Sequence, residues 1–430
     1  MKKHSLVISL LIISALSFSS AAFSQDNAGK RWKMGGVPAI AYDSDMGFRY
    51  GALANFYDHG PDMELYPAYR HSLYVEWSHT TKGNDIKQMK YDSKYLIPKV
   101  RVTASARLET EQAMDFYGFN GYESLYNPAF TDAGSDEYLT RMYYRMNFRS
   151  LRLKADFQGE LGLKKLKWYA GVAHYNLQIG SVDIEGINEK KDDEGDLLPD
   201  IPGLYDEYVN KGYIPADQAE GGYTSTLKFG LVADTRDKEA NPNRGIWAET
   251  FIVTAPGFIG NKSAYTGVIA TFRHYLPIIH NKLTFAYRIN YQSTLSGSIP
   301  WFMMVYKPDT YVSWNGLGGS KTLRGIMRNR VVGEGAVLGN FELRWKFVNF
   351  NLGGQKIYLA LSPFVDAAKI TKKYALQPDV TGDTDGVHLS YGAGLHIALN
   401  ENFIIAVDYG MAADKRDGTS GLYIGLDFLF

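Results

Sequence analysis

The sequence contains no cysteine among its 430 residues. A domain held together by disulfides is therefore excluded, and so is a lipid anchor attached to a cysteine after export. The nine histidines are scattered, with His274 and His280 as the closest pair, so the His-x3-His spacing of a helical zinc site is absent. We expect neither a bound metal nor another cofactor.

Net charge is also lacking, because 46 Lys and Arg residues are balanced by 46 Asp and Glu residues. A chain without excess charge has no general attraction to nucleic acid, and we expect no such partner. Beyond residue 24 there is no apolar run near the roughly 18 to 20 residues that a helix needs to cross a bilayer. A membrane protein built from helices is thereby excluded.

The first residues have the pattern of a secretory signal. Lys2 and Lys3 precede an apolar run from Leu6 to Leu16, and small residues follow at Ala22-Phe23-Ser24. We therefore predict a signal peptide over residues 1–24 and a short periplasmic segment over 25–36.

Strand patterns dominate the remainder, which holds many of the 31 Tyr, 22 Phe and 43 Gly residues. In 340–347 every odd position is apolar or aromatic and every even position is an amide or a charged residue. Such segments run to ten residues or more, whereas strands of soluble sandwiches average about five or six. A strand that crosses a membrane in a barrel needs about 9 to 11 residues. We predict an all-β protein, with a 16-stranded antiparallel transmembrane β-barrel over residues 37–430.

The predicted connections alternate in length, as a barrel requires when its short turns and long loops lie at opposite ends. The long ones, 113–136, 182–221, 297–336 and 368–387, all fall on one side of the strand count. The sixteen strands are expected at 37–43, 46–58, 69–81, 85–96, 100–112, 137–161, 166–181, 222–235, 245–256, 264–276, 283–296, 337–349, 356–367, 388–399, 403–413 and 421–430.

The connection over 297–336 is long for a segment without strands of its own, which is typical of a functional loop. It contains Gly316-Leu317-Gly318-Gly319-Ser320-Lys321-Thr322-Leu323-Arg324-Gly325-Ile326-Met327-Arg328. A phosphate-binding P-loop requires Gly directly before the Lys-Thr pair and a helix after it. Here Ser320 precedes Lys321 and no helix is predicted, so we reject the nucleotide interpretation.

The segment Leu323-Arg324-Gly325-Ile326 resembles the loop motif of the BamA-type outer-membrane assembly superfamily, also called bacterial surface antigens. The resemblance includes Asn340-Phe341-Glu342-Leu343-Arg344 and Phe364-Val365-Asp366-Ala367-Ala368 on the following strands. The last strand, Leu422 to Phe430, is similar to the targeting signal of such barrels. Other matching segments are Pro38-Ala39-Ile40-Ala41-Tyr42, Asp234-Thr235-Arg236-Asp237 and Asn241-Pro242-Asn243-Arg244-Gly245.

This resemblance implies that the loop between the eleventh and twelfth strands folds into the barrel lumen. Alternation turns Glu342 and Asp366 inward, and the resemblance names them as the partners of Arg324, whose planar fork suits carboxylates. We expect Gly325 to supply a tight backbone at the loop tip. The alternative is an external loop whose Arg324 is solvated.

The resemblance also implies a non-enzymatic role in inserting, assembling or translocating envelope proteins or lipids. It implies a weak seam between the first and last strands, marked by Val37, Tyr42, Tyr423 and Phe430. The expected location is the outer membrane, in contact with lipid and lipopolysaccharide, with barrel-protein or exported clients. Family members carry POTRA domains, and 25–36 is too short for one, so periplasmic or lipoprotein partners are expected to replace them.

Two other functions stay open at this point. One is a passive or substrate-selective pore, whose selectivity the charges in the lumen would set. The other is a barrel enzyme acting on lipid, with His396 beside Ser390 or Ser362, although any barrel places some His and Ser residues inside.

Overall fold

The computed structural model of the protein describes residues 31–61, 64–65, 68–163, 165–189, 191–239, 241–307, 314–352, 355–375, 384–399 and 403–430. The predicted signal peptide and residues 25–30 lie outside this part of the chain. No helix in the described part is long and apolar enough to cross a membrane.

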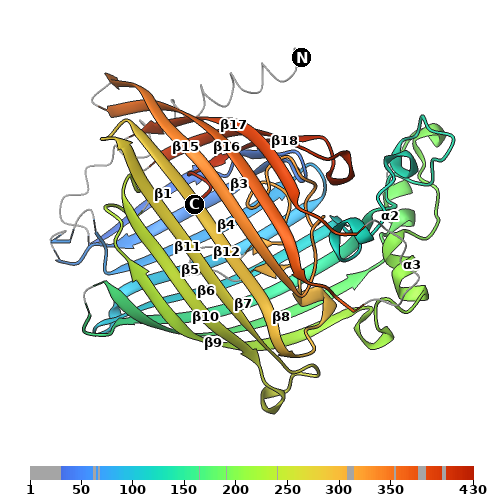
Figure 1. The fold of residues 1–430 in the computed structure, drawn as a ribbon, viewed down its shortest axis with the longest axis horizontal. Coiled ribbons are helices and arrows are strands. Elements are labelled where there is room, and N and C mark those ends of the chain that lie inside the picture. The colour runs from blue at the N-terminus through green and yellow to red at the C-terminus, as the bar shows by residue number, and fades with distance from the viewer. Residues whose placement is uncertain are drawn as a thin grey trace.

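All described strands except a short two-stranded ribbon form one antiparallel sheet that closes on itself (Figure 1). The first strands are β1 (Trp32–Pro38) and β2 (Ala41–Asp43). From β2 onward each strand pairs with the next one of the sheet, and β19 (Ser420–Leu426) returns to pair with β2. With β1 and β2 sharing the first place, this is the predicted barrel of sixteen strands, and that prediction is confirmed. The strands that follow β2 are β3 (Gly47–Asp58), β4 (His71–Thr80), β5 (Asn84–Ile97), β6 (Val100–Asp115), β7 (Arg145–Glu160), β8 (Leu166–Gly180), β9 (Gly221–Asp234), β10 (Gly245–Ala255), β11 (Tyr265–Ile279), β12 (Leu283–Gly297), β15 (Gly335–Leu352), β16 (Gln355–Lys372), β17 (His388–Leu399), β18 (Phe403–Ala412) and β19 (Ser420–Leu426).

The first strand differs from the prediction of 37–43. It consists of β1 (Trp32–Pro38) and β2 (Ala41–Asp43), and both pair with β3. Pro38 has no N–H to donate, and the chain rejoins the ladder through the N–H of Ala39, which donates to the carbonyl of Gly51. The predicted start at Val37 is therefore wrong by five residues, because the Gly35-Gly36 pair hides the strand in a sequence pattern.

The two ends of the barrel differ, as predicted. The long connections 116–144, 181–220, 298–334 and 373–387 leave one end, which we call the long-loop end. It carries the short helices α2 (Ile184–Asn188) and α3 (Leu204–Asn210) (Figure 1). The predicted strand 137–161 is too long, because β7 begins only at Arg145 and the preceding residues belong to this end. We call the opposite end the short-turn end.

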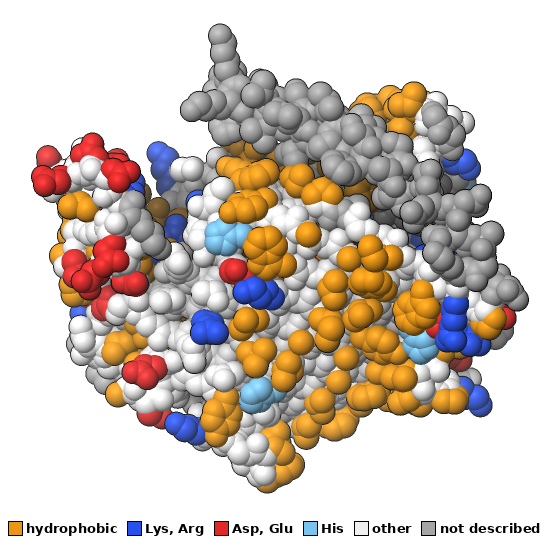
Figure 2. Space-filling model, turned by 180° about the vertical axis from the view of Figure 1, so that it is seen from behind, with side chains coloured by type: hydrophobic (Ala, Val, Ile, Leu, Met, Phe, Trp, Pro, Cys, Tyr) orange, Lys and Arg blue, Asp and Glu red, His pale blue; other side chains and the backbone are white. Residues whose placement is uncertain are grey.

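The wall of the barrel has a polar inner face and an apolar outer face. On β15 the inward Asn340, Glu342 and Arg344 are at most 2% exposed, whereas the outward Phe341 and Trp345 are 37% and 50% exposed. Figure 2 shows apolar side chains gathered on the outside of the strands and acidic side chains at the long-loop end. An apolar outer wall over a polar interior is the arrangement of a barrel that sits in lipid.

The loops at the long-loop end pack into an aromatic layer, which we call the dome. Phe116, Tyr208 and Trp301 come from three different connections, and Phe116 contacts the other two rings edge to face. Burial here raises the pKa of Tyr205 on α3 to about 12. No single loop could bury these apolar side chains alone. Packed together, the three loops bury them and cover this end of the barrel. Other buried members of the dome are Phe119, Tyr143, Tyr144, Leu204, Ile214, Phe302, Met303 and Met304.

Candidate functional site

The connection from β12 to β15 folds back against the inner wall of the barrel. It contains a short 3-10 turn, η7 (Trp301–Met303), and a two-stranded ribbon of β13 (Tyr306–Lys307) and β14 (Trp314–Asn315). Leu317, Leu323 and Ile326 of this loop are at most 1% exposed and pack against apolar residues of β15 and β16. The loop is therefore an internal plug, held in part by apolar burial.

Arg324 lies at the centre of this plug and is fully buried. Its Nε and Nη2 donate to the two carboxylate oxygens of Asp366, at 2.9 Å and 3.0 Å, and its backbone N–H donates to the same carboxylate at 3.1 Å. Its Nη1 donates to Glu342 at 2.8 Å. The structure thus brings together the three residues that the sequence analysis joined, in the bidentate geometry that a guanidinium fork favours.

The ring of Phe364 forms the other side of the Arg324 site. The guanidinium carbon of Arg324 lies 3.4 Å from the ring centroid, which is the geometry of a cation–π contact. Phe364 and Asp366 are two residues apart on β16, so both point inward and present a ring and a carboxylate to one guanidinium.

A third carboxylate, which the sequence analysis missed, completes the site. Asp408 on β18 accepts from Arg324 Nη1 at 3.3 Å and lies 3.0 Å from His396 Nε2 on β17. The alternation of 403–413 turns Asp408 inward, so the sequence pattern predicts that its carboxylate faces the lumen. Asp408 ties the plug to the strand that neighbours β19.

The charge network continues to the C-terminus. Glu342 accepts from Arg344 Nε at 2.8 Å, and Arg344 Nη2 donates to the carbonyl of Phe430 at 2.9 Å. Arg344 also lies over the rings of Phe428 and Phe430, at 4.2 Å and 4.9 Å from their centroids. The last residues therefore contact the lumen network.

This position corrects the prediction that Phe430 belongs to the seam. The strand β19 ends at Leu426, and Asp427 has a φ of 68°, which turns the chain away from the extended course. The aromatic rings of Phe428 and Phe430 then contact cationic and aromatic side chains inside the barrel, and Phe428 is only 8% exposed. An alternating pattern cannot reveal this turn, because it continues unbroken to the end of the sequence.

The seam itself is short. Among the described residues β19 and β2 share two register pairs, Tyr423 with Asp43 and Ile424 with Tyr42. Val37 is paired with Leu53 of β3 instead, and no register pair joins β1 to β19 in this part of the chain. The predicted seam residues Tyr42 and Tyr423 thus lie at the junction, and placing Val37 opposite the last strand was wrong.

The loop tip reaches the seam through Gly325. Its N–H donates to the hydroxyl of Tyr423 on β19 at 3.0 Å. Gly325 has a φ of 96°, and a Cβ built on it would lie 2.5 Å from the backbone of Gly410 on β18. A Cβ on Gly410 would in turn meet the carbonyl oxygen of Arg324 at 2.3 Å. Loop and wall therefore touch backbone to backbone, as only two glycines permit.

We expect the change Gly325→Ala to destabilise the protein by about 1–3 kcal/mol more than Gly260→Ala does. Gly260 lies in an exposed turn, has a similar φ of 92° and has no atom within 4 Å of the added Cβ. Comparing the two variants therefore separates the close approach from the backbone strain that both share. Denaturant unfolding in detergent micelles measures the difference, and equal midpoints would show that the contact with Gly410 is easily relaxed.

The plug continues into the dome through two further arginines. Arg328 pairs with Glu111 and lies 3.5 Å from Asp115, both at the end of β6. Arg330 donates to the backbone carbonyls of Gly121 and Ser124, at 2.8 Å and 3.1 Å. The motif loop and the dome are consequently one connected structure.

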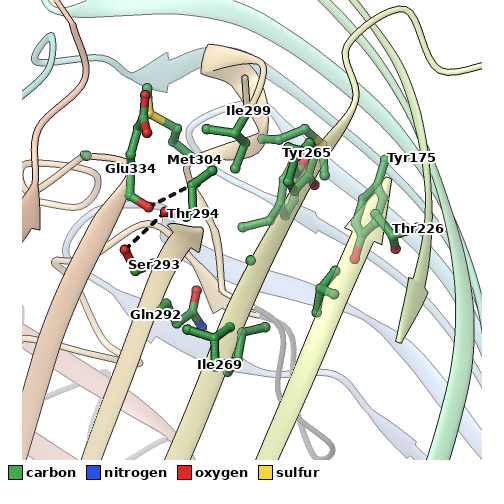
Figure 3. A pocket seen from close by; sticks show the side chains of 16 residues that line it. Tyr175, Thr226, Tyr265, Ile269, Gln292, Ser293, Thr294, Ile299, Met304 and Glu334 are labelled. Carbon is green, nitrogen blue, oxygen red and sulfur yellow. Dashed lines mark hydrogen bonds between the residues drawn. The ribbon is translucent and has the colours of Figure 1, made fainter. Parts of the chain in front are cut away.

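A cavity of about 260 Å³ lies beside the tip of the plug, with Gly325, Ile326 and Tyr423 among the residues that line it. A smaller cavity of about 60 Å³ lies under β11 and β12, and Figure 3 shows Tyr175, Tyr265 and Gln292 among the side chains that line it. This volume suits a few water molecules, since one occupies roughly 30 Å³ of the liquid. The smaller cavity cannot hold a substrate of ordinary size.

The histidine considered for lipid hydrolysis has a serine neighbour. Ser362 Oγ lies 3.3 Å from His396 Nδ1, whereas Ser390 makes no such contact within the described residues. Both Ser362 and His396 are completely buried, and the ring of Phe428 packs edge-on against His396. A hydrolase needs a nucleophile that its substrate can reach, so this arrangement favours a role in the hydrogen-bond network.

Comparison with known proteins identifies the family. A family model described as the Omp85 superfamily domain matches residues 88–430 of the sequence. The chain belongs to the Omp85 superfamily. No curated protein matches the sequence.

Two solved structures have a similar fold to this Omp85 chain. One is BamA from Haemophilus ducreyi lacking POTRA domains 1-3, with 16% identity and a TM-score of 0.56 over 93% of this chain and 70% of that chain. The other is CdiB from Escherichia coli, with 10% identity and a TM-score of 0.56 over 93% of this chain and 63% of that chain. The Omp85 chain thus spans less than two thirds of the CdiB structure, and at these identities the likeness concerns the fold.

Proposed function

We propose that this protein resides in an outer membrane and inserts or translocates envelope proteins by opening its barrel at the seam between β2 and β19. The observation that carries the proposal is the length of the seam. Among the described residues two register pairs and the hydrogen bonds between Ser44 and Leu422 close it, whereas β18 and β19 share seven register pairs and β10 and β11 share eleven. The junction of β2 and β19 is therefore the one that separates with the fewest backbone hydrogen bonds lost.

The strands beside the seam support the same proposal. Within the described residues β1 pairs through its register with β3, and the turn at Asp427 takes the chain end away from β1. A strand edge with few partners is a template for a further strand, and adding a strand to such an edge is a common way of binding an extended chain. A client segment is expected to pair there.

The internal plug gives the barrel a rigid interior beside a weak seam. Arg324 joins β15, β16 and β18 through Glu342, Asp366 and Asp408, so it holds three strands on one side of the junction. Plug and dome also occupy the long-loop end of the interior, and this argues against a passive pore. We propose that membrane lipid and lipopolysaccharide contact the apolar outer wall and that partner proteins meet the short-turn end.

Depletion of the protein in its native host, followed by quantitative proteomics of the outer membrane, tests the proposal. We expect several other barrel proteins to decline together, because an insertion factor serves many clients, and we expect the wild-type gene to restore them. Loss of one exported protein would narrow the function to dedicated secretion. An outer membrane of unchanged protein content would overturn the proposal.

A further inference from the structure

Basic side chains gather on the inner wall of β5, β6 and β7, and one of them, Arg152, lies over the ring of Tyr306 in the connection that forms the plug. Lys90 lies on β5, Arg107 on β6, and Arg152 and Lys154 on β7. Alternation points all four inward, since the outward Met89 and Leu153 between them are 49% and 42% exposed. We call these four residues the basic wall.

The register places like charges next to one another. Arg107 is directly opposite Arg152, and Ser105 lies between Lys90 and Lys154 in the neighbouring row. Like charges directly opposite each other destabilise a sheet. Glu109 lies between the two guanidiniums and offsets their repulsion, so the uncompensated charge is that of the neighbouring row, at Lys90.

Two carboxylates offset part of this charge. Glu109 binds Arg107 at 2.7 Å and Arg152 at 2.5 Å, and Asp156 binds Lys154 at 2.8 Å. Lys90 forms no ion pair within the described residues and lies 5.5 Å over the ring of Tyr74. Lys90 is therefore the member of the basic wall that has no carboxylate partner among the described residues, and Glu109 shows that two neighbouring guanidiniums here hold an oxyanion between them.

Part of the basic wall faces solvent inside the barrel. Lys90 is exposed, and the side chains of Arg107 and Lys154 are 27% and 18% exposed, whereas Arg152 is only 9% exposed. On the opposite wall Arg288 and Arg344 are at most 2% exposed. Because plug and dome cover the long-loop end, this open part of the lumen is reached from the short-turn end.

We propose that the basic wall binds phosphate groups, carried by a soluble anion or by a lipid headgroup, that enter from the short-turn end. Guanidinium forks and lysine ammoniums are the side chains that hold phosphate oxygens best. The four cations lie on three adjacent strands and in two adjacent rows, within a patch roughly 10 Å across at strand spacings of about 4.8 Å. A compact anion with several terminal oxygens fits such a patch better than an acidic peptide, whose charges are spread along a chain.

Titration calorimetry of the detergent-solubilised full-length protein with inorganic pyrophosphate at low salt tests the site. We expect saturable binding that Lys90→Gln weakens about tenfold, which corresponds to about 1.4 kcal/mol. Lys90 is the residue to change, because it supports no ion pair whose loss would disturb the fold. The matched control is Lys87→Gln on the outer face of the same strand, where the side chain is 58% exposed, and its affinity should equal that of the wild type.

Competition measurements identify whether the phosphate is carried by a lipid or by a soluble anion. Displacement of pyrophosphate by short-chain phosphatidic acid, but not by phosphatidylcholine, would indicate a lipid headgroup, and failure to displace it would indicate a soluble anion. Binding of pyrophosphate that is equal in the wild type and Lys90→Gln, or absent in both, would overturn the proposal. So would a poly-glutamate peptide that binds in a Lys90-dependent way when pyrophosphate does not.

Discussion

Replacing Arg324 by alanine is expected to lower the free energy of unfolding by about 3–5 kcal/mol, the usual cost of leaving buried charges without their partner. The side chain is fully buried and contacts three carboxylates, those of Asp366, Glu342 and Asp408. Arg344 and His396 remain as charged partners for two of them, but Asp366 keeps only neutral donors, the amide of Asn340 and the backbone N–H of residue 324. The largest part of the cost therefore falls on Asp366.

The same change should loosen the plug, because Arg324 is its main polar link to β16 and β18. In planar bilayers we expect the wild-type protein to give small, fluctuating currents and Arg324→Ala to give larger ones. Denaturant unfolding in micelles measures the stability, and Arg324→Lys should fall between the two, since a lysine keeps the charge but not the fork.

The control for this experiment is Arg141→Ala, which removes an exposed arginine from the loop before β7. It should leave both the unfolding midpoint and the conductance unchanged. If Arg324→Ala unfolds at the wild-type midpoint and conducts no more than the wild type, the plug does not depend on this ion-pair network.

The strands and the inward carboxylates could be predicted from the sequence because both follow from a period of two. Asn340, Glu342 and Arg344 face the lumen for the same reason that Phe341 and Trp345 face outward. Asp408 obeys this rule as well, but a motif centred on a loop gives no hint of which other strand the loop tip touches. Closure of the barrel places β18 beside Arg324, and the local sequence pattern of either segment does not predict this contact.

The features that the sequence did not reveal are those in which the chain departs from its own alternation. The break between β1 and β2 depends on a proline that cannot donate to the ladder. The inward turn at Asp427 depends on Arg344 and on neighbouring rings that are distant in sequence. The dome depends on contacts among three loops, none of which has a regular pattern.

Locking the seam with a disulfide is expected to abolish the proposed function without unfolding the barrel. Tyr42 and Ile424 are register partners across β2 and β19. Opposed residues of antiparallel strands have Cα atoms about 4.5–5.5 Å apart, within the range that a disulfide spans. The natural chain has no cysteine, so Tyr42→Cys with Ile424→Cys introduces the only two thiols.

The measurement is rescue of the depleted host by the cross-linked double variant, read as the amount of other barrel proteins in the outer membrane. We expect no rescue under oxidising conditions and recovery after a reducing agent is added. The matched control joins Ile252→Cys and Val268→Cys, register partners across β10 and β11 on the far side of the barrel, and it should rescue in both states.

These two cross-links distinguish opening of the seam from flexibility of the barrel as a whole. A barrel that must deform everywhere would lose function with either disulfide, whereas a barrel that opens at one junction would lose it only with the first. Full rescue by the oxidised Tyr42→Cys, Ile424→Cys variant would mean that β2 and β19 stay paired while the protein acts. The short seam would then be a structural boundary, and clients would have to pass by another route.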